Sequence, residues 1–309
     1  MGKITWHIEP TSKCILECPL CDRTWFYQKF KKRLTQDINI DHLINFFKDY
    51  EPSIYMCGNN GDPIYHAKFH ELCRRLKQIK SKIQIVTNGS GKKKTWWKKL
   101  CEILTNEDTI EFSIDGLQDT NHLYRINSKW DSLMDAIEVV AKYDIKTTWK
   151  FIVFKHNEHQ IKDAEKLSKE LGIEKFKLIK SDRWWKQDII PSPEYVDPVY
   201  KHQIAVTKGI DKKSTIKQQC MTVQNGDPDY LLYIDSDGDF YPCCKTGLYA
   251  FRYKNIFSPK HKRYNIMNNT IKQLLNGYEV KRFFDSTKSY DTADNCCKIY
   301  CGGNKQTND

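Results

Sequence analysis

The sequence predicts an α/β fold built on a parallel sheet. Short apolar runs alternate with segments in which apolar residues recur every three or four positions, the pattern of strands alternating with helices. Consecutive parallel strands need crossover segments of this length, and helices usually provide them. The chain of 309 residues is also long enough to bury one large core and a smaller second one.

The pattern assigns each element in turn. We expect strands at residues 4–8, 53–57, 83–87, 109–114, 147–154 and 175–179, and helices at residues 41–50, 69–79, 95–104, 132–143 and 161–171. Pro52 ends the first helix, and Gly172 suits the position after the last one. Residues 25–33, rich in aromatic and basic side chains, are expected to form a loop.

Three cysteines follow the first strand with the spacing C-x3-C-x2-C, at Cys14, Cys18 and Cys21. Thiolates are soft ligands that select zinc, copper(I) or iron-sulfur clusters. A 4Fe-4S cluster held by three of them keeps one iron without a protein ligand, where chemistry can occur. Structural zinc needs a fourth ligand and usually two close cysteine pairs, so zinc is the second interpretation.

This triplet, near the N-terminus and after a first strand, resembles the motif of the radical S-adenosylmethionine (SAM) superfamily. The resemblance implies that the open iron chelates SAM, and that an electron from the cluster cleaves SAM to a 5'-deoxyadenosyl radical that abstracts hydrogen from a substrate. It also implies a partial (β/α)6 TIM-like barrel with its active site at the carboxyl ends of the strands. A reductase or a flavodoxin-like protein would supply the electron.

Polar residues after the later strands fit this resemblance. Gly61-Asp62-Pro63 resembles the Gly-Gly-Glu-Pro motif that binds the amino group of SAM, although Asp62 is one methylene shorter than Glu. Arg125 is expected to hold the SAM carboxylate, because guanidinium binds carboxylate through two hydrogen bonds. The set that the resemblance implies is Gly61, Asp62, Asn88, Ser113, Asp115, Arg125 and Asn157. Taken singly, Asn-Gly and Asp-Gly pairs are ordinary turns.

A second group of cysteines surrounds a predicted hairpin at residues 230–242 and a predicted helix at residues 269–284. This arrangement resembles the SPASM and twitch extensions of radical SAM enzymes, which hold auxiliary iron-sulfur clusters. A full SPASM domain uses more cysteines than this region offers, so one auxiliary 4Fe-4S cluster fits better. Its implied ligands are Cys220, Cys243, Cys297 and Cys301, with Cys244 and Cys296 as adjacent alternatives. A zinc-stapled subdomain is the other explanation.

These observations divide the chain into a radical SAM barrel at residues 1–180, a linker over the barrel mouth at residues 181–219, and a twitch- or SPASM-like domain at residues 220–309. The other three cysteines fall on strand or helix faces. We therefore predict that Cys57, Cys73 and Cys101 are small core residues.

Composition adds weaker signals. The formal net charge of +11 favours an anionic partner. Residues 91–99 interleave lysine with tryptophan as nucleic-acid-binding surfaces do, although such a run is more often the solvated start of a surface helix. Twelve cysteines diluted in a long chain, with no signal-peptide pattern at its start, indicate a reducing compartment, expected to be the cytoplasm. No apolar run approaches membrane-spanning length, so no membrane partner is expected.

The function predicted from these patterns is hydrogen abstraction from a peptide or protein residue by a radical SAM enzyme. The alternatives are oxidation of a small sugar-like alcohol by an enzyme with a single auxiliary cluster, nucleic-acid modification, and a non-catalytic metal-binding module. Formation of 5'-deoxyadenosine from SAM would separate an enzyme from a module.

Overall fold

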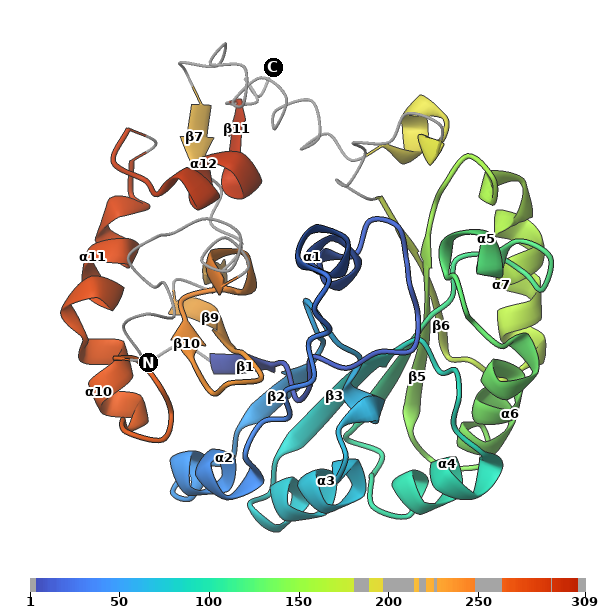
Figure 1. Ribbon diagram of the computed structural model, residues 1–309, viewed down its shortest axis with the longest axis horizontal. Coiled ribbons are helices and arrows are strands. Elements are labelled where there is room, and N and C mark those ends of the chain that lie inside the picture. Colours follow the sequence, from blue (N-terminus) through green and yellow to red (C-terminus); the bar gives the residue numbers. More distant parts are fainter. Residues whose placement is uncertain are drawn as a thin grey trace.

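A computed structural model describes residues 4–180, 189–196, 214–216, 221–224, 227–247, 263–289 and 291–304. Its main feature is one curved sheet of nine strands in the order β10-β9-β1-β2-β3-β4-β5-β6, with β8 paired to β9 (Figure 1). The strands are β1 (Ile4–Ile8), β2 (Ser53–Met56), β3 (Lys82–Thr87), β4 (Thr109–Ser113), β5 (Lys146–Ile152), β6 (Lys175–Ile179), β8 (Met221–Gln224), β9 (Asp227–Ile234) and β10 (Phe240–Tyr241). Strands β1 to β6 pair in parallel, which confirms the predicted partial barrel.

Helices cover the outer face of this sheet (Figure 1). They are α2 (Ile40–Phe47), α3 (Phe69–Gln78), α4 (Lys94–Cys101), α6 (Trp130–Val140) and α7 (Ile161–Glu170), with the short α5 (Asn121–Tyr124) before α6. Each of the longer helices turns apolar residues toward the strands, as Leu133 and Ile137 of α6 do, and these side chains are buried. The resulting core between the helices and the sheet holds the ends of the strands in fixed relative positions.

The prediction of a loop at residues 25–33 was wrong, because α1 (Asp22–Phe30) covers most of this segment. The carboxylate of Asp22 lies in the first turn, where it is favoured by the helix dipole. Trp25 and Lys29 are one helical turn apart, and the Lys29 ammonium lies 4.9 Å from the centre of the Trp25 ring. Contacts of this kind support a helix that has no apolar stripe, and the periodicity therefore did not reveal it.

The C-terminal part extends the sheet of the barrel. Strand β9 pairs in parallel with β1 and antiparallel with β10, so the predicted hairpin forms and one of its strands joins the barrel. The single predicted helix is divided at Gly277 into α10 (Ile271–Asn276) and α11 (Tyr278–Ser286). The helix α12 (Asn295–Cys301) follows, and β7 (Ser214–Ile216) pairs with β11 (Gly302–Asn304).

Most of the predicted linker, residues 181–219, lies outside the described residues. Within its described part, Ile189, Ile190 and Val196 pack against a small apolar cluster that contains Leu20 of the cysteine loop. In the described ranges, no helix combines the length and the apolar character needed to cross a bilayer.

Candidate active site

A cavity of about 190 Å³ lies at the carboxyl ends of the barrel strands, and Cys14, Cys18 and Cys21 all line it. Residues predicted to bind SAM reach this cavity from the loops and ends of several strands. They are Gly61, Asp62, Asn88, Ser113 and Arg125. Asp115 and Asn157, the other two predicted residues, do not line the cavity. Residues separated by more than 100 positions in the sequence are thus gathered around one space.

The cysteine loop is held against neighbouring loops. The Sγ of Cys14 accepts hydrogen bonds from the Leu16 amide at 3.4 Å and from the Asn88 Nδ2 at 3.6 Å. Burial raises the pKa of the Cys14 thiol and raises that of Cys18 to about 12. These thiols therefore become thiolates when a metal centre stabilises the charge.

The donor set suits a multi-iron cluster. Within the described ranges, no three side chains of His, Cys, Asp or Glu converge closely enough to hold a single metal ion. The thiols of Cys14, Cys18 and Cys21 instead border a common cavity. Three soft ligands around a space fit an iron-sulfur cluster with one open iron.

Asp62 ties the loop after β2 to the loop after β3. Its buried carboxylate accepts hydrogen bonds from the Thr87 hydroxyl at 2.9 Å and from the Asn88 amide at 2.7 Å. Burial raises the pKa of Asp62 to about 6 against the effect of these hydrogen bonds. In the structure, Asp62 thus holds the two loops together, and its contact with SAM stays a prediction.

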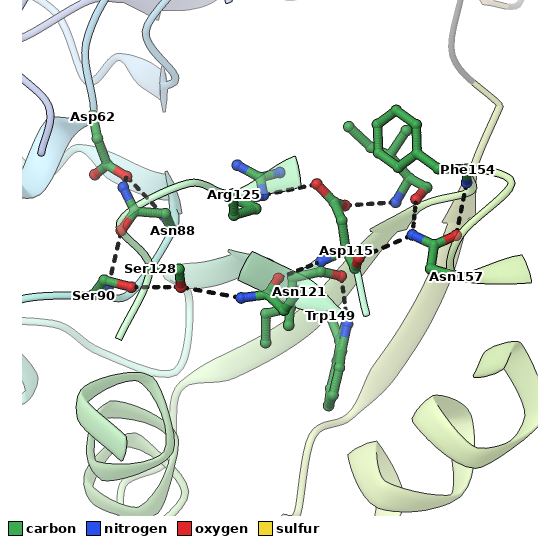
Figure 2. Close-up of polar contacts among 12 residues, drawn as sticks. Asp62, Asn88, Ser90, Asp115, Asn121, Arg125, Ser128, Trp149, Phe154 and Asn157 are labelled. Atoms are coloured by element: carbon green, nitrogen blue, oxygen red, sulfur yellow. Dashed lines mark hydrogen bonds and ion pairs between the residues drawn. The ribbon is translucent and has the colours of Figure 1, made fainter. Parts of the chain in front are cut away.

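Arg125 is positioned by a buried ion pair (Figure 2). Its Nε donates to the Oδ2 of Asp115 at 2.7 Å, and the Oδ1 of Asp115 accepts from the Ile152 amide at 2.8 Å. The Nδ2 of Asn157 donates to the backbone carbonyl of Asp115 at 2.9 Å. The two terminal guanidinium nitrogens of Arg125 make no hydrogen bond to the described residues. Asp115 and Asn157 therefore support Arg125 from behind the cavity wall.

Glu9 supports a loop that lines the cavity, and the sequence reasoning missed it. Its carboxylate is fully buried, and its Oε1 accepts hydrogen bonds from the amides of Asn60 at 2.7 Å and Gly61 at 2.9 Å. The Tyr233 hydroxyl of β9 donates to its other oxygen. Burial raises the pKa of Glu9. Glu9 thus links the loop after β2 to the C-terminal extension, and a lone acidic residue at the end of an apolar strand was the only signal for it.

Among the residues that line the cavity without having been predicted there are Cys57 and Arg23. Cys57 is half-buried and faces the cavity, so its assignment to the core was wrong, whereas Cys73 and Cys101 are buried as predicted. The prediction failed because Cys57 lies just past the end of β2, where the barrel opens. Arg23 also lines the cavity, and its buried Nε has no hydrogen-bond partner among the described atoms.

The late cysteines gather near Thr246. The hydroxyl of Thr246 lies 3.2 Å from the Sγ of Cys243 and 3.8 Å from the Sγ of Cys296. Hydrogen bonds with Cys243 and Cys297 raise the pKa of the Cys296 thiol. Cys296 therefore lies within hydrogen-bonding reach of both Cys243 and Cys297, whereas the predicted ligand Cys220 lies outside the described residues.

Comparison with known families decides the assignment. The profile of the radical SAM superfamily matches residues 8–168, just over half of the chain. The chain belongs to the radical SAM superfamily. A second profile, SPASM, described as an iron-sulfur cluster-binding domain, matches residues 226–302. The cofactors of this radical SAM enzyme are therefore a 4Fe-4S cluster and SAM, with auxiliary iron-sulfur binding in the C-terminal part.

Individual relatives are distant. Pre-heme d1 synthase of Dinoroseobacter shibae is 24% identical over 176 residues, which cover 57% of this chain and 42% of that protein. The structure of anSMEcpe with bound AdoMet aligns with a TM-score of 0.63 at 16% identity, covering 96% of this chain and 89% of that one. Streptococcus suis SuiB bound to the precursor peptide SuiA aligns with a TM-score of 0.62 at 15% identity, covering 91% and 66%. This radical SAM chain thus shares their fold.

The loop after β2 of this radical SAM enzyme has no room for a side chain at Gly61. A Cβ there would lie 1.9 Å from the carbonyl oxygen of Thr11. We expect Gly61→Ala to force the loop away from the cysteine loop, to destabilise the metal-free fold by about 1–3 kcal/mol, and to weaken SAM binding. Urea unfolding and equilibrium dialysis with SAM measure the two effects.

A matched control for this variant is Gly172→Ala, at the end of α7 and away from the cavity. Gly172 has φ +75° and an added Cβ would meet only Ala141 at 3.6 Å, so the cost is backbone strain of about 1 kcal/mol. SAM affinity should be unchanged in this control. Equal SAM affinities for Gly61→Ala and the wild type would contradict a role of the loop in SAM binding.

Proposed function

We propose that this chain is a radical SAM enzyme that abstracts a hydrogen atom from a residue of a peptide substrate. The observation that carries the radical chemistry is that three cysteines and a supported arginine border one cavity at the carboxyl ends of the strands. The SPASM match and the likeness to SuiB, which is solved with a precursor peptide, support a peptide as the substrate.

Different residues of the cavity would bind different parts of the cofactors. Cys14, Cys18 and Cys21 would hold the 4Fe-4S cluster, which supplies reductive cleavage of SAM when bound. Arg125 would bind the SAM carboxylate through its terminal nitrogens, since its Nε is already used by Asp115. The burial of this ion pair keeps the guanidinium in one orientation and limits the access of water to the carboxylate.

The remaining predicted residues would line or support the same site. Gly61 lets the loop after β2 approach the cysteine loop, and Asp62 fixes that loop to Asn88. Asn88 also donates toward the Cys14 sulfur, which would lower the charge on that cluster ligand. Ser113 borders the same space from the end of β4. Asn157 would act through Asp115 as a positioning residue.

The domain division and the second cluster are part of the same proposal. Residues 1–180 would form the barrel, residues 181–219 the linker over its mouth, and residues 220–309 the cluster-binding extension, whose strand β9 completes the sheet. One auxiliary 4Fe-4S cluster would be held by Cys220, Cys243, Cys297 and Cys301, with Cys244 and Cys296 as the adjacent alternatives to Cys243 and Cys297. An acidic one-electron donor of the flavodoxin type would reduce the enzyme.

A second candidate function is modification of a small molecule. The observation that favours it is the sequence similarity to pre-heme d1 synthase, whose name describes the synthesis of a cofactor precursor. Oxidation of a sugar-like alcohol belongs to this class of substrate. The same cavity and the same cluster would serve either substrate, so the two functions differ in what enters the barrel mouth.

The test of the proposed function is SAM cleavage by the anaerobically reconstituted protein. With dithionite as reductant, we expect 5'-deoxyadenosine and methionine in equal amounts from the iron-loaded protein and none from the metal-free protein. Iron-loaded protein that binds SAM and forms no 5'-deoxyadenosine would contradict the proposal.

Deuterium transfer separates the two substrate classes. One reaction contains deuterated synthetic peptides whose sequences are those of small open reading frames next to the gene. A second reaction contains the low-molecular-mass fraction of an extract from deuterated cells. Deuterium in 5'-deoxyadenosine from a peptide supports peptide modification. Deuterium only from the extract would assign the enzyme to small-molecule chemistry.

A further inference from the structure

A second cavity, of about 670 Å³, opens on the outer side of the barrel next to the site described above. It lies between the loop after β3 and the starts of α5 and α6. Gly91, Lys92 and Lys93 line it from the first of these segments, and His122 and Lys129 line it from the others. None of these residues has a role in the proposed SAM site.

The side chains of Asn88, Ser90 and Ser128, which Figure 2 labels, form the wall between this outer cavity and Cys14. Ser128 lines the outer cavity, and its hydroxyl lies 3.1 Å from the hydroxyl of Ser90. The Ser90 amide donates to the Asn88 Oδ1 at 2.9 Å, and the Asn88 Nδ2 donates to the Cys14 sulfur at 3.6 Å. An electron that arrives at the outer cavity therefore has only this wall to cross before it reaches a cluster ligand.

The outer cavity carries unpaired positive charge. Lys92, Lys93 and Lys129 form no ion pair with any acidic residue in the part of the chain that the structure describes. Two carboxylates also line the cavity, but that of Asp135 is paired with Lys94 at 3.2 Å. The lysines thus outnumber the remaining carboxylate, and they give this surface a positive potential that attracts an acidic partner.

Three exposed apolar side chains belong to segments that adjoin the outer cavity. Ile15, between the first two cysteines, is 38% exposed, and a Cβ at Gly91 would lie 2.8 Å from its Cδ1. Leu123, which follows His122, is 51% exposed. Ile126 is 39% exposed, and its carbonyl accepts a hydrogen bond from the Glu17 amide of the cysteine loop at 3.0 Å. Exposed apolar side chains on the cysteine loop and on the segment bonded to it, together with the lysines of the outer cavity, suit a small and transient protein interface.

We propose that this surface, formed by Ile15, Lys92, Lys93, Leu123, Ile126 and Lys129, docks an acidic one-electron donor protein that has an apolar cofactor edge. The inference rests on the proposed function, because reductive cleavage of SAM consumes one electron from the cluster. In each transfer the donor is oxidised by one electron and the N-terminal cluster is reduced by one, and no bond or proton moves in this step.

The position of the surface argues against the substrate as its occupant. Hydrogen abstraction requires contact between the substrate and the deoxyadenosyl group, which belongs on the cysteine side of the wall. A substrate group in the outer cavity would be separated from it by Asn88, Ser90 and Ser128. Electron transfer does not require contact, so it can operate across the same wall.

Two reductants test the inference. We expect the double variant Lys92→Glu/Lys129→Glu to form 5'-deoxyadenosine with dithionite at the wild-type rate. With a sub-saturating, photochemically reduced flavodoxin, its rate should fall by about 10-fold or more at low salt, because the charge reversal removes the electrostatic attraction. The wild-type rate with flavodoxin should decrease as salt is added, and the rate of the variant should change little.

The matched control is Lys98→Glu/Lys99→Glu, which makes the same change of charge on the exposed side of α4, outside the cavity. Its rate with flavodoxin should stay near that of the wild type. Equal flavodoxin-driven rates for the wild type and for Lys92→Glu/Lys129→Glu would overturn the inference. So would a loss with both reductants, which would assign the lysines to the SAM site.

Two further outcomes are distinguishable. Binding of a single-stranded RNA oligonucleotide that is lost in the Lys92→Glu/Lys129→Glu variant, with the flavodoxin-driven rate retained, would reassign the surface to nucleic acid. A wild-type protein that forms no 5'-deoxyadenosine with dithionite would overturn the proposed function, and the docking surface with it.

Discussion

The Cys14/Cys18/Cys21→Ala protein is expected to lose about four irons per chain and all formation of 5'-deoxyadenosine. The three thiols line one cavity, and burial raises the pKa of Cys14 and Cys18, so a bound metal centre favours the thiolate form of these two. Alanine removes every soft ligand from this position. Iron, acid-labile sulfide and 5'-deoxyadenosine are measured on anaerobically purified protein.

The matched control is Cys73→Ala/Cys101→Ala, since both cysteines are buried in the core away from the cavity. Its iron content should equal that of the wild type. Full SAM cleavage by the triple variant would end the assignment of the cluster to these cysteines.

The number of irons that remain in the Cys14/Cys18/Cys21→Ala protein shows which metal the C-terminal extension binds. About four irons with matching sulfide would support one auxiliary 4Fe-4S cluster among the late cysteines. One zinc without iron would show instead that the extension is a structural zinc site, and it would remove any redox role from Cys243 and its neighbours.

Asp115→Ala is expected to destabilise the metal-free fold by about 3–5 kcal/mol, because it leaves a buried cation without its partner. The ion pair with Arg125 has side chains that are 14% and 0% exposed, and the Ile152 amide would also lose its acceptor. Urea unfolding measures the change. The surface control Asp135→Ala, which breaks an exposed pair with Lys94, should cost less than about 1 kcal/mol.

A double variant identifies the cause of this loss. Removing the cation as well, in Asp115→Ala/Arg125→Met, should restore part of the stability, because no unpaired charge is then buried. A double variant that is less stable than Asp115→Ala would show that the Arg125 guanidinium contributes through other contacts. Asp115→Ala with wild-type stability would contradict the buried ion pair itself.

The sequence by itself determined most of the local elements and the family to which the cysteine triplet points. Strand β1 was predicted with its observed bounds, and the helices on the outer face were predicted to within a few residues, because apolar periodicity reports directly which face of an element is buried. The cysteine triplet was recognisable because its three cysteines lie within eight residues. The polar motifs after β2, β3 and β4 could be expected to lie close together, because parallel strands bring their carboxyl ends to one edge of the sheet.

Only the tertiary structure decided which distant groups meet. The pairing of β9 with β1, and the contact of Tyr233 with Glu9, join residues more than 200 positions apart, and a strand's own sequence does not name its neighbour. From the sequence alone, Cys57 was predicted to be a core residue, and the position where β2 ends shows that it faces the cavity. Arg125 was predicted to bind the SAM carboxylate, and only the structure shows that its Nε is already bonded to Asp115. Periodicity fixes the face that a residue occupies, whereas its partner depends on how the strands close around the cavity, and that closure is a property of the whole chain.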